Sequence, residues 1–430
     1  MQTNFTIAQL TDPDIRHADN ILRKCVHCGF CTATCPTYLL LGDELDSPRG
    51  RIYLIKDMLE SAKPASAKVV KHIDRCLSCL ACMTTCPSGV NYMHLVDQAR
   101  EHIENTFQRP FTDRALRALL AWILPNPRLF RLALISAQFS RHFLSLMPRK
   151  LSNLIAFAPR HLPKRSRADE PGIKRTNGAP THRVALLAGC AQRVLDPGIN
   201  ESTIRLLTRH GCEVVISPGT GCCGALTHHM GKNLSASTKA KANIAAWTRE
   251  LEDVGLDAIV TNTSGCGTML QNYGHIFRDD KIWSDRAATI SDRVVDISEF
   301  LAKIGVSGVA PSKLSVAYHS ACSLQHGQQV HEVPKTLLKD CGFEVLEIPE
   351  GHLCCGSAGT YNLLQPTLAN KLRDRKLANI ETTEPDVIAA GNIGCITQLA
   401  SGTVIPIVHT VQLLDWATGG PKPEPMGHSF

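Results

Sequence analysis

The chain has 430 residues, which is enough for two or three domains that each have a core. Its formal net charge is +7, a modest excess, and its few aromatic residues are not interleaved with basic runs, which argues against nucleic-acid binding. No window of 18 apolar residues occurs, so we predict no helix that spans a membrane.

The beginning of the chain and its cysteine content predict a cytoplasmic protein. Residues 1–20 carry Asp12, Asp14 and Asp19 and lack the apolar stretch of a signal peptide. Eighteen cysteines would suggest disulfides in a secreted protein, but in a reducing compartment they indicate metal ligands.

Two runs between residues 25 and 87 share the pattern C-x2-C-x2-C-x3-C-P. Two-cluster ferredoxins hold a pair of [4Fe-4S] cubanes with this pattern, and the fourth cysteine of each run binds the other cluster. Three cysteines at two-residue intervals reach three iron corners, so the fourth ligand must come from elsewhere. The predicted ligands are therefore Cys25, Cys28, Cys31 and Cys86 for the first cluster, and Cys76, Cys79, Cys82 and Cys35 for the second.

Structural zinc is the competing interpretation of these runs. A zinc ion takes four thiolates and leaves no role for a third cysteine at the same interval, so the spacing favours iron–sulfur clusters. His27, inside the first run, is interpreted as a neighbour that tunes a cluster potential rather than a ligand.

The residues between the two runs predict helices. Ser47-Pro48 is a helix start, and Ile52, Ile55 and Leu59 recur at helical spacing, which predicts a helix over 48–60; a second is expected over 65–74. Residues 1–110 are thus predicted to form a helical ferredoxin-type domain. Within it, Arg49 and Arg51 are either ordinary surface charges or charges that tune a cluster.

Residues 111–158 are predicted to form a basic amphipathic helical segment. Its second run places apolar side chains on one helical face: Leu132, Ile135, Phe139, Phe143 and Leu146. Seven basic residues flank the two runs: Arg114, Arg117, Arg128, Arg131, Arg141, Arg149 and Lys150. Such helices lie on an anionic bilayer, dock on a partner subunit or cover neighbouring domains, and the sequence leaves all three open. Residues 159–181, rich in Pro, Gly and charge, are expected to be a linker.

The rest of the chain contains an internal duplication, with repeats predicted over 182–305 and 306–430. Four cysteines recur at offsets of 132, 132, 132 and 129 residues, which is too regular for chance. The first set is Cys190, Cys222, Cys223 and Cys266, and the second is Cys322, Cys354, Cys355 and Cys395.

Each repeat is predicted to be an α/β unit whose cysteines gather where loops leave the strands, the usual place for ligand sites in open sheets. Four cysteines per half indicate a metal centre: a further iron–sulfur cluster, a structural zinc ion or, without metal, a redox dithiol. Cys212 and Cys341 have no counterparts in the duplication and are expected to be buried apolar residues.

Residues 20–90, with Arg23–Tyr38 and Leu41–Ile52 the most diagnostic stretches, resemble the iron–sulfur subunits of bacterial glycolate oxidases. The paired C-x31-C-C-G repeats resemble the cysteine-rich domain shared with heterodisulfide reductase and anaerobic glycerol-3-phosphate dehydrogenase subunits. The resemblance implies an α+β and α/β multidomain protein, in which a helical domain with two [4Fe-4S] clusters precedes a duplicated α/β cysteine-rich domain.

The chain departs from the family pattern at the end of each repeat. The complete cysteine-rich motif ends in C-x2-C, whereas Cys266 is followed by Gly-Thr-Met269 and Cys395 by Ile-Thr-Gln398. Each half therefore lacks one ligand of the non-cubane cluster that the complete motif binds, while a cubane held by the four remaining cysteines stays open.

The resemblance implies an electron-transfer role without a catalytic residue in this chain. Cubanes pass single electrons, and the sequence carries no flavin site, so FAD is expected on partner subunits only. The resemblance implies that these flavoprotein subunits oxidise glycolate to glyoxylate and D-lactate to pyruvate, and that the chain relays electrons toward a membrane quinone. That role predicts a peripheral position on the cytoplasmic face of the inner membrane.

Three alternatives remain at this point. One is a thiol–disulfide reductase like heterodisulfide reductase, with chemistry at Cys222-Cys223 or Cys354-Cys355. Another is an electron-transfer subunit that serves lactate or glycerol 3-phosphate. The third is a scaffold whose duplicated domain holds zinc.

Overall fold

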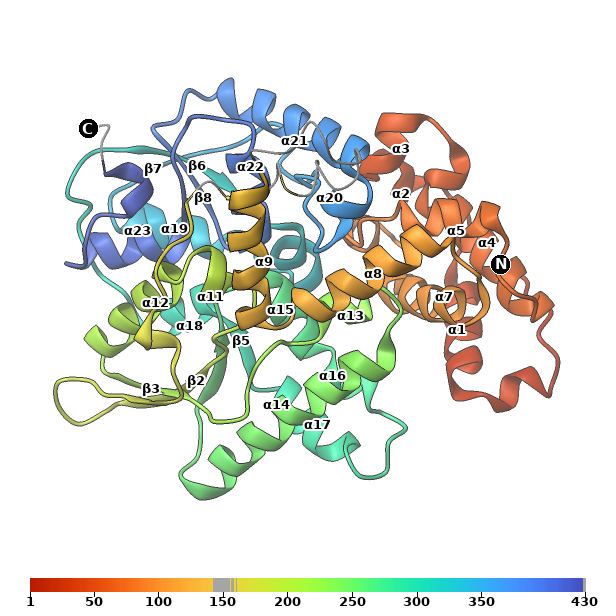
Figure 1. Ribbon diagram of the computed structural model, residues 1–430, viewed down its shortest axis with the longest axis horizontal. Helices are drawn as coiled ribbons and strands as arrows, with labels where there is room; N and C mark the ends of the chain where they lie inside the picture. Colours follow the sequence, from red (N-terminus) through yellow and green to blue (C-terminus); the bar gives the residue numbers. More distant parts are fainter. Residues whose placement is uncertain (142–154, 156–157, 160, 428–430) are drawn as a thin grey trace.

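The computed structural model describes residues 1–141, 155, 158–159 and 161–427. Figure 1 shows an N-terminal helical domain in red and orange that lies beside two α/β units, one green and one blue. The helical, α/β and duplicated character predicted from the sequence is confirmed.

The N-terminal domain is built from four longer helices: α1 (Pro13–Lys24), α4 (Pro48–Ser61), α5 (Ala67–Asp74) and α7 (Tyr92–Thr106). Their apolar faces meet in one core that contains Leu22, Ile55, Ile73 and Leu95. Pro48 occupies the first turn of α4, and the side chain of Ser47 caps it by accepting a hydrogen bond from the Gly50 N–H. Helices predicted over 48–60 and 65–74 are therefore confirmed. The short elements of the domain are η1 (Gln9–Thr11), α2 (Phe30–Ala33), α3 (Pro36–Leu41), η2 (Glu44–Asp46) and α6 (Ala81–Thr84).

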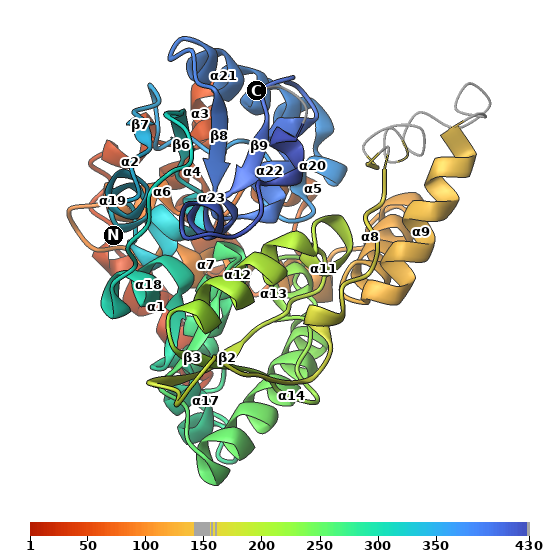
Figure 2. The same ribbon diagram turned by 90° about the vertical axis from the view of Figure 1, so that its left-hand side faces the viewer.

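Helices α8 (Phe111–Ile123) and α9 (Pro127–Ser140) follow as a bent pair, and Figure 2 shows them standing out from one side of the molecule. Phe130 and Leu134 of α9 pack against Val194 of the first repeat. The predicted apolar face is exposed, with Leu132, Ile135 and Phe139 at 59%, 37% and 73% of their full accessibility. Phe143, Leu146, Arg149 and Lys150 lie outside the described residues.

No single helix among the described residues has the length and apolar character to cross a membrane. Taken together, α8 and α9 have that length and apolar character, but the chain bends by 120° between them. The basic residues of this segment also differ in their environment. Arg117 is buried in ion pairs with Asp74 and Asp113, whereas Arg114 and Arg128 are exposed.

The two repeats carry sheets of the same topology. In the first, β2 (His182–Leu186), β3 (Cys212–Ile216), β4 (Ala258–Thr261) and β5 (Val294–Asp296) lie in the order β3-β2-β4-β5, all parallel. In the second, β6 (Ser315–His319), β7 (Glu344–Leu346), β8 (Val387–Ala390) and β9 (Ile407–His409) lie in the order β7-β6-β8-β9, again parallel. In both halves, the second parallel strand along the chain (β3 or β7) therefore pairs with the first (β2 or β6).

Helices cover both sheets, and the two halves share a continuous apolar core that includes Val184 and Val316. The first repeat contains α11 (Gln192–Leu195), α12 (Gly198–Arg209), α13 (Ala225–His228), α14 (Asn233–Asp253), α15 (Ser264–Gln271), α16 (Tyr273–Ile276), α17 (Ser284–Ser291) and α18 (Ile297–Ile304). The second contains the π-helical turn η5 (Ser323–Gln328), then α19 (Val333–Asp340), α20 (Tyr361–Leu364), α21 (Pro366–Glu381), α22 (Ile393–Ala400), α23 (Thr410–Ala417) and η6 (Glu424–Met426).

The segment 159–181, expected to be a linker, contributes to the first sheet. Its strand β1 (Gly172–Lys174) pairs antiparallel with β3, and the short helix η4 (Arg167–Asp169) precedes it. Asp169 is buried and accepts a hydrogen bond from Asn200 at 2.6 Å. The linker prediction is corrected here, because backbone pairing with β3 orders three residues that carry no strand pattern of their own.

Candidate metal centres

The first predicted ligand set surrounds one cavity in the N-terminal domain. Cys25, Cys28, Cys31 and Cys86 all line it, as does Cys82 of the second set, and its empty volume is about 440 Å³ including space open to solvent. Cys86 comes from the second run, so the fold brings it to the three cysteines of the first run. The side chains of Ile52, Val90 and Tyr92 also line this cavity and give it a largely apolar wall.

Cys35, the fourth cysteine of the first run, faces the second run. The Tyr92 hydroxyl donates to Cys76 Sγ at 3.7 Å, and an Arg51 N–H lies 3.9 Å from Cys35 Sγ. Electrostatic interactions connect Cys82 with Cys79, Cys76 and Cys35 and, to the smallest extent of the four, with Cys31 of the first set. The described residues therefore place Cys35 on the side of the second set; which cysteine binds which iron stays a prediction.

The loops of both runs have the same unusual backbone. His27 and Gly29 of the first run have φ angles of 56° and 87°, and the matching Ser78 and Leu80 of the second have 51° and 64°. Left-handed residues at alternate positions turn successive N–H groups toward the same side, as an anionic cluster requires. A leucine held at positive φ is strained, so the repetition of this geometry in both runs fits a cluster inside each loop.

Two thiols of the second set, those of Cys79 and Cys82, need positive charge nearby to ionise. Burial raises the pKa of Cys79 and of Cys82 well above the usual value, and neighbouring cysteines raise both further. In the first set, burial raises the pKa of Cys31 to about 11. Metal ligands must be thiolates, so the irons of a bound cluster would supply positive charge in addition to that of the nearby Arg51 guanidinium.

Arg51 is the buried cation nearest the second set. It is 1% exposed and donates to the His72 carbonyl at 2.8 Å and to Thr37 Oγ1 at 3.0 Å. Its carboxylate partner, Asp46, is fully buried and also accepts from His72 and Arg75 at 2.9 and 2.7 Å. The interpretation of Arg51 as a surface charge is therefore wrong, whereas Arg49 pairs with Glu44 and lines the first cavity.

The backbone of each repeat requires the glycine of the C-C-G motif. Gly224 and Gly356 have φ angles of 93° and 90°, and a Cβ there would lie 3.0 Å from the Ala236 carbonyl oxygen and 2.4 Å from that of Ala369. Only glycine lets the loop approach the next helix, α14 or α21, this closely. Each glycine N–H then points at the first cysteine of its pair, at 3.4 Å from Cys222 Sγ and Cys354 Sγ.

The eight cysteines of the duplication form two matching groups at the carboxyl ends of the strands. Their thiols interact with one another in the same order in both halves: Cys190, Cys222, Cys223 and Cys266 in the first repeat, and Cys322, Cys354, Cys355 and Cys395 in the second. Four neighbouring thiols at the topological switch point can bind a metal centre. Cys212 and Cys341 lie in the apolar core, apart from both groups.

Comparison with known proteins places this geometry in a family. Residues 21–90 match the family model of a 4Fe-4S dicluster domain, and residues 184–271 and 316–400 each match that of a cysteine-rich domain. The chain is 41% identical, over 97% of its length and 99% of the relative's, to the glycolate oxidase iron-sulfur subunit of Escherichia coli. The chain belongs to the family of glycolate oxidase iron–sulfur subunits. It therefore carries [4Fe-4S] clusters in its N-terminal domain, and zinc is excluded as the interpretation of the two runs.

Two more distant relatives and one solved structure are also similar to this chain. A probable glycolate oxidase iron-sulfur subunit of Bacillus subtilis is 33% identical over 93% of this chain and 94% of its own. Lactate utilization protein A of a Geobacillus species is 26% identical over 54% of this chain and 99% of its own length. A solved structure of a hypothetical protein from Helicobacter pylori has a TM-score of 0.55 at 11% identity, covering 96% of this chain and 74% of that one, and so supports the fold alone.

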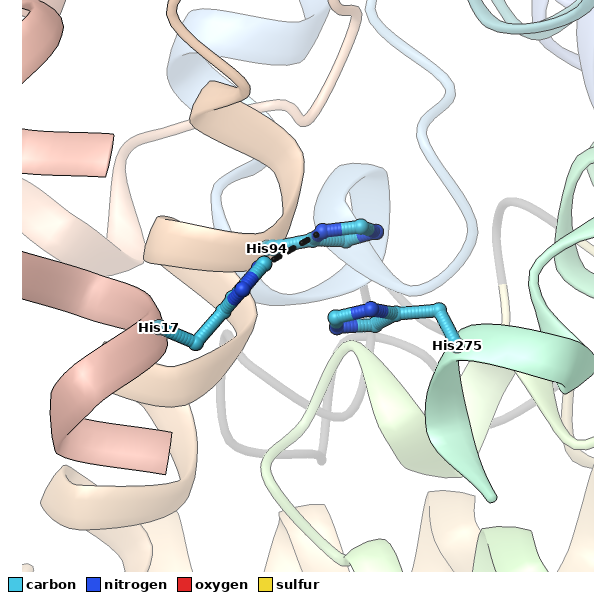
Figure 3. A group of neighbouring side chains, drawn as sticks. All are labelled: His17, His94 and His275. Carbon is cyan, nitrogen blue, oxygen red and sulfur yellow. Dashed lines mark hydrogen bonds between the residues drawn. The ribbon is translucent and has the colours of Figure 1, made fainter. Parts of the chain in front are cut away.

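A group of three histidines joins the N-terminal domain of this iron–sulfur subunit to its first repeat (Figure 3). His17 of α1 lies 3.2 Å from His94 of α7, whose ring stacks on His275 of α16 with a centroid distance of 3.5 Å. Both nitrogens of His94 have partners, because Asn91 lies 3.0 Å from Nδ1 and Asn272 2.9 Å from Nε2. Parallel stacked rings cannot direct their lone pairs at one ion, so we interpret this group as a neutral interdomain contact.

Acidification is expected to weaken this contact. Burial lowers the pKa of all three imidazoles, that of His275 to about 2, and Arg278 lowers all three further. Neighbouring histidines also lower the pKa values of His94 and His275, whereas Asp14 and Asp279 raise that of His17. The unfolded chain takes up protons below about pH 6.5 while the folded state does not, so stability present above that pH is lost as the pH falls.

Replacing His275 with glutamine should therefore flatten the pH dependence of the thermal unfolding temperature between about pH 7.5 and about pH 5.5. The expected contribution is at most about 1 kcal/mol after allowance for solvent screening. Exposed His331, replaced in the same way, is the control and should leave the slope unchanged. Equal slopes for the His275 variant and the original protein would contradict the interpretation.

Sequence reasoning missed the residues that reach a site from another part of the chain. Asp46 and the three histidines carry no spacing signal, because each contributes one side chain from a separate helix or loop. The sequence did contain an indication of His319, which is buried beside Cys355 and Cys395. Aligning the two repeats of this family member places His319 opposite Leu187, so the repeats differ at this position.

Proposed function

We propose that the chain is the electron-transfer subunit of a glycolate-oxidising complex, and that flavoprotein partner subunits remove the hydride from glycolate to give glyoxylate. The observation that carries the proposal is the 41% identity to a glycolate oxidase iron-sulfur subunit over nearly the whole chain, combined with all eight ferredoxin-type cysteines. When bound, [4Fe-4S] clusters supply single-electron transfer, which cannot by itself oxidise a 2-hydroxy acid.

The residues of this chain hold and insulate the relay. Eight thiols anchor the clusters, the apolar side chains around the first cavity limit water, and Arg51 sets a buried positive charge beside the second set. Arg100 fixes the second loop from α7 by donating to Ser78 Oγ at 2.6 Å and to the Cys76 carbonyl at 2.7 Å. This rigidity keeps the structural change on electron transfer small.

A thiol–disulfide reductase is the less favoured function. Cys222, Cys223, Cys354 and Cys355 are each 7% exposed or less, so a disulfide substrate has no direct approach to them in this structure. D-Lactate as a second substrate is part of the proposal, because relatives named lactate utilization protein A share about half of the chain.

The proposal is tested by purifying the chain anaerobically from its own host through a tag and quantifying iron, flavin and co-purifying polypeptides. Flavin should appear only with a partner polypeptide, and the complex should reduce a soluble quinone with glycolate. Glycolate oxidation by the isolated chain, or a complex that lacks flavin, would overturn the assignment.

We further propose that the complex delivers electrons at the inner face of the membrane, with α8 and α9 as the contact. Phe111, Trp122 and Leu132 on these helices are 74%, 63% and 59% exposed, and exposed Arg114 and Arg128 accompany them. Aromatic and basic side chains on one protruding element are typical of an interfacial segment on anionic lipid.

Changing Trp122 and Leu132 to serine together should weaken binding to vesicles that contain an anionic lipid by about tenfold or more, since each exposed apolar side chain contributes about 1 kcal/mol or more on insertion. The matched control is Val404→Ser, a fully exposed apolar residue in the second repeat, which should leave binding unchanged. Vesicle co-sedimentation measures both, and unchanged binding of the double variant would contradict the membrane contact.

A further inference from the structure

The two cysteine groups differ at one position that faces the thiols. Val184 to Cys190 and Val316 to Cys322 align without gaps, which places Leu187 of the first repeat opposite His319 of the second. Leu187 packs in an apolar cluster with Cys223. The second repeat therefore presents an imidazole where the first presents a hydrocarbon side chain.

His319 is buried without satisfying its own polar atoms. It is 1% exposed, and neither Nδ1 nor Nε2 has a hydrogen-bond partner among the described residues. A ring nitrogen of His319 and the sulfur atoms of Cys355 and Cys395 all lie within 4.8 Å of one another. An unpaired buried imidazole is costly, and a metal ion bound to it would remove that cost.

A buried cation accompanies the imidazole. Lys376 of α21 is 1% exposed, donates to the Glu350 carbonyl at 2.8 Å and interacts electrostatically with Cys322, Cys355 and Cys354. Gly224 approaches Ala236 and Gly356 approaches Ala369, so these two alanines occupy equivalent positions. Counting the same number of residues onward from each alanine places the neutral Asn243 of the first repeat opposite Lys376. Thiolate ligands carry negative charge, and Lys376 offsets it with a buried ammonium group, whereas Lys239, which acts on Cys222 in the first repeat, is only half-buried.

The second group also touches the ferredoxin-type domain. Cys322 and Cys354 belong to an apolar cluster with Leu77, and Cys79 packs against this cluster. Thr84 and His326 connect the second run to the π-helical turn η5 at 2.9 Å. A metal centre in the second repeat would therefore be the neighbour of the second [4Fe-4S] cluster.

We propose that the second repeat binds a further iron–sulfur cluster through Cys322, Cys354, Cys355 and Cys395, with the imidazole of His319 as a nitrogen ligand. Five donors exceed the four that a zinc ion takes, and adjacent cysteines suit a cluster with several irons. Neither repeat has the second cysteine of the C-x2-C ending, and in the second repeat His319 takes the place of that missing ligand. The inference extends the relay proposed above, and its test measures metal binding rather than turnover, so the two can fail separately.

The direct test is pulsed electron paramagnetic resonance on anaerobically purified, reduced full-length protein labelled with ¹⁵N-histidine. A hyperfine coupling from a directly bound histidine nitrogen should appear, and iron should exceed the roughly eight atoms of two cubanes. The absence of such a coupling, iron at about eight atoms, or one zinc ion per chain in place of the additional iron would each overturn the proposal.

His319→Leu gives the second repeat the side chain that the first repeat already tolerates, so the fold should persist. The nitrogen coupling should disappear while the two ferredoxin-type clusters remain. His409→Leu is the matched control, because His409 is equally buried in the same repeat and caps α23 through Val411. Retention of the coupling in His319→Leu, or its loss in His409→Leu alone, would contradict ligation by His319.

Discussion

Replacing Cys86 with serine is expected to remove the same cluster as replacing Cys28, although the two cysteines belong to different runs. Both line the single cavity of the first set, together with Cys25 and Cys31. Cys35→Ser should instead remove the cluster that Cys79→Ser removes. Each variant should lose about four irons, because a cubane with three remaining protein ligands is readily lost.

The measurement is iron content together with the electron paramagnetic resonance spectrum of the reduced protein. Cys212→Ala is the control, since Cys212 is fully buried in the core of the first repeat and should retain both signals. If Cys86→Ser and Cys79→Ser lost one and the same signal while Cys28→Ser lost the other, the crossed ligand assignment would be wrong.

Arg51→Gln is expected to have the largest effect on stability outside the cysteines. Asp46 is fully buried and would lose one of its cations, and removing one partner of a buried ion pair costs about 3–5 kcal/mol. Arg75 and His72 still contact Asp46, so the lower end of that range is expected. Thermal unfolding under anaerobic conditions measures the loss, and a decrease below about 1 kcal/mol would contradict this role.

The same variant should lower the reduction potential of the second cluster. A guanidinium N–H lies 3.9 Å from Cys35 Sγ, and a nearby positive charge favours the reduced, more negative cluster. Asp46 offsets part of the effect, so a shift of about 60 mV, or about 1.4 kcal/mol, is expected. Arg51→Lys retains the charge and should shift the potential less. The double variant Asp46→Asn, Arg51→Gln removes both charges of the buried pair, so it separates the effect on the reduction potential from the effect on stability. An unchanged potential in Arg51→Gln would contradict electrostatic tuning.

The sequence predicted those features whose information is local or periodic. The cysteine runs, the helix after Ser47-Pro48 and the offset between Cys190 and Cys322 are spacings within a chain, and spacing follows directly from ligand geometry and helix periodicity. The parallel sheets followed from the repetition of strand and cysteine in both halves.

Features that depend on distant parts of the chain could not be predicted in this way. The packing of Cys79 beside the group of Cys322 joins residues more than 200 positions apart. Strand β1 has only three residues and exists because β3 offers it an edge. Arg51 has an ordinary helical position in the sequence, and only the fold shows that this position is the buried face of α4.

The most direct test of the account is whether glycolate reduces the clusters of this chain through a partner flavin. The complex purified anaerobically from the native host is mixed with glycolate and frozen, and the electron paramagnetic resonance spectrum is compared with that of the isolated chain treated identically. The account predicts signals of reduced [4Fe-4S] clusters in the complex and none in the isolated chain. Reduced flavin beside clusters that stay oxidised, or reduction of the isolated chain by glycolate, would contradict it.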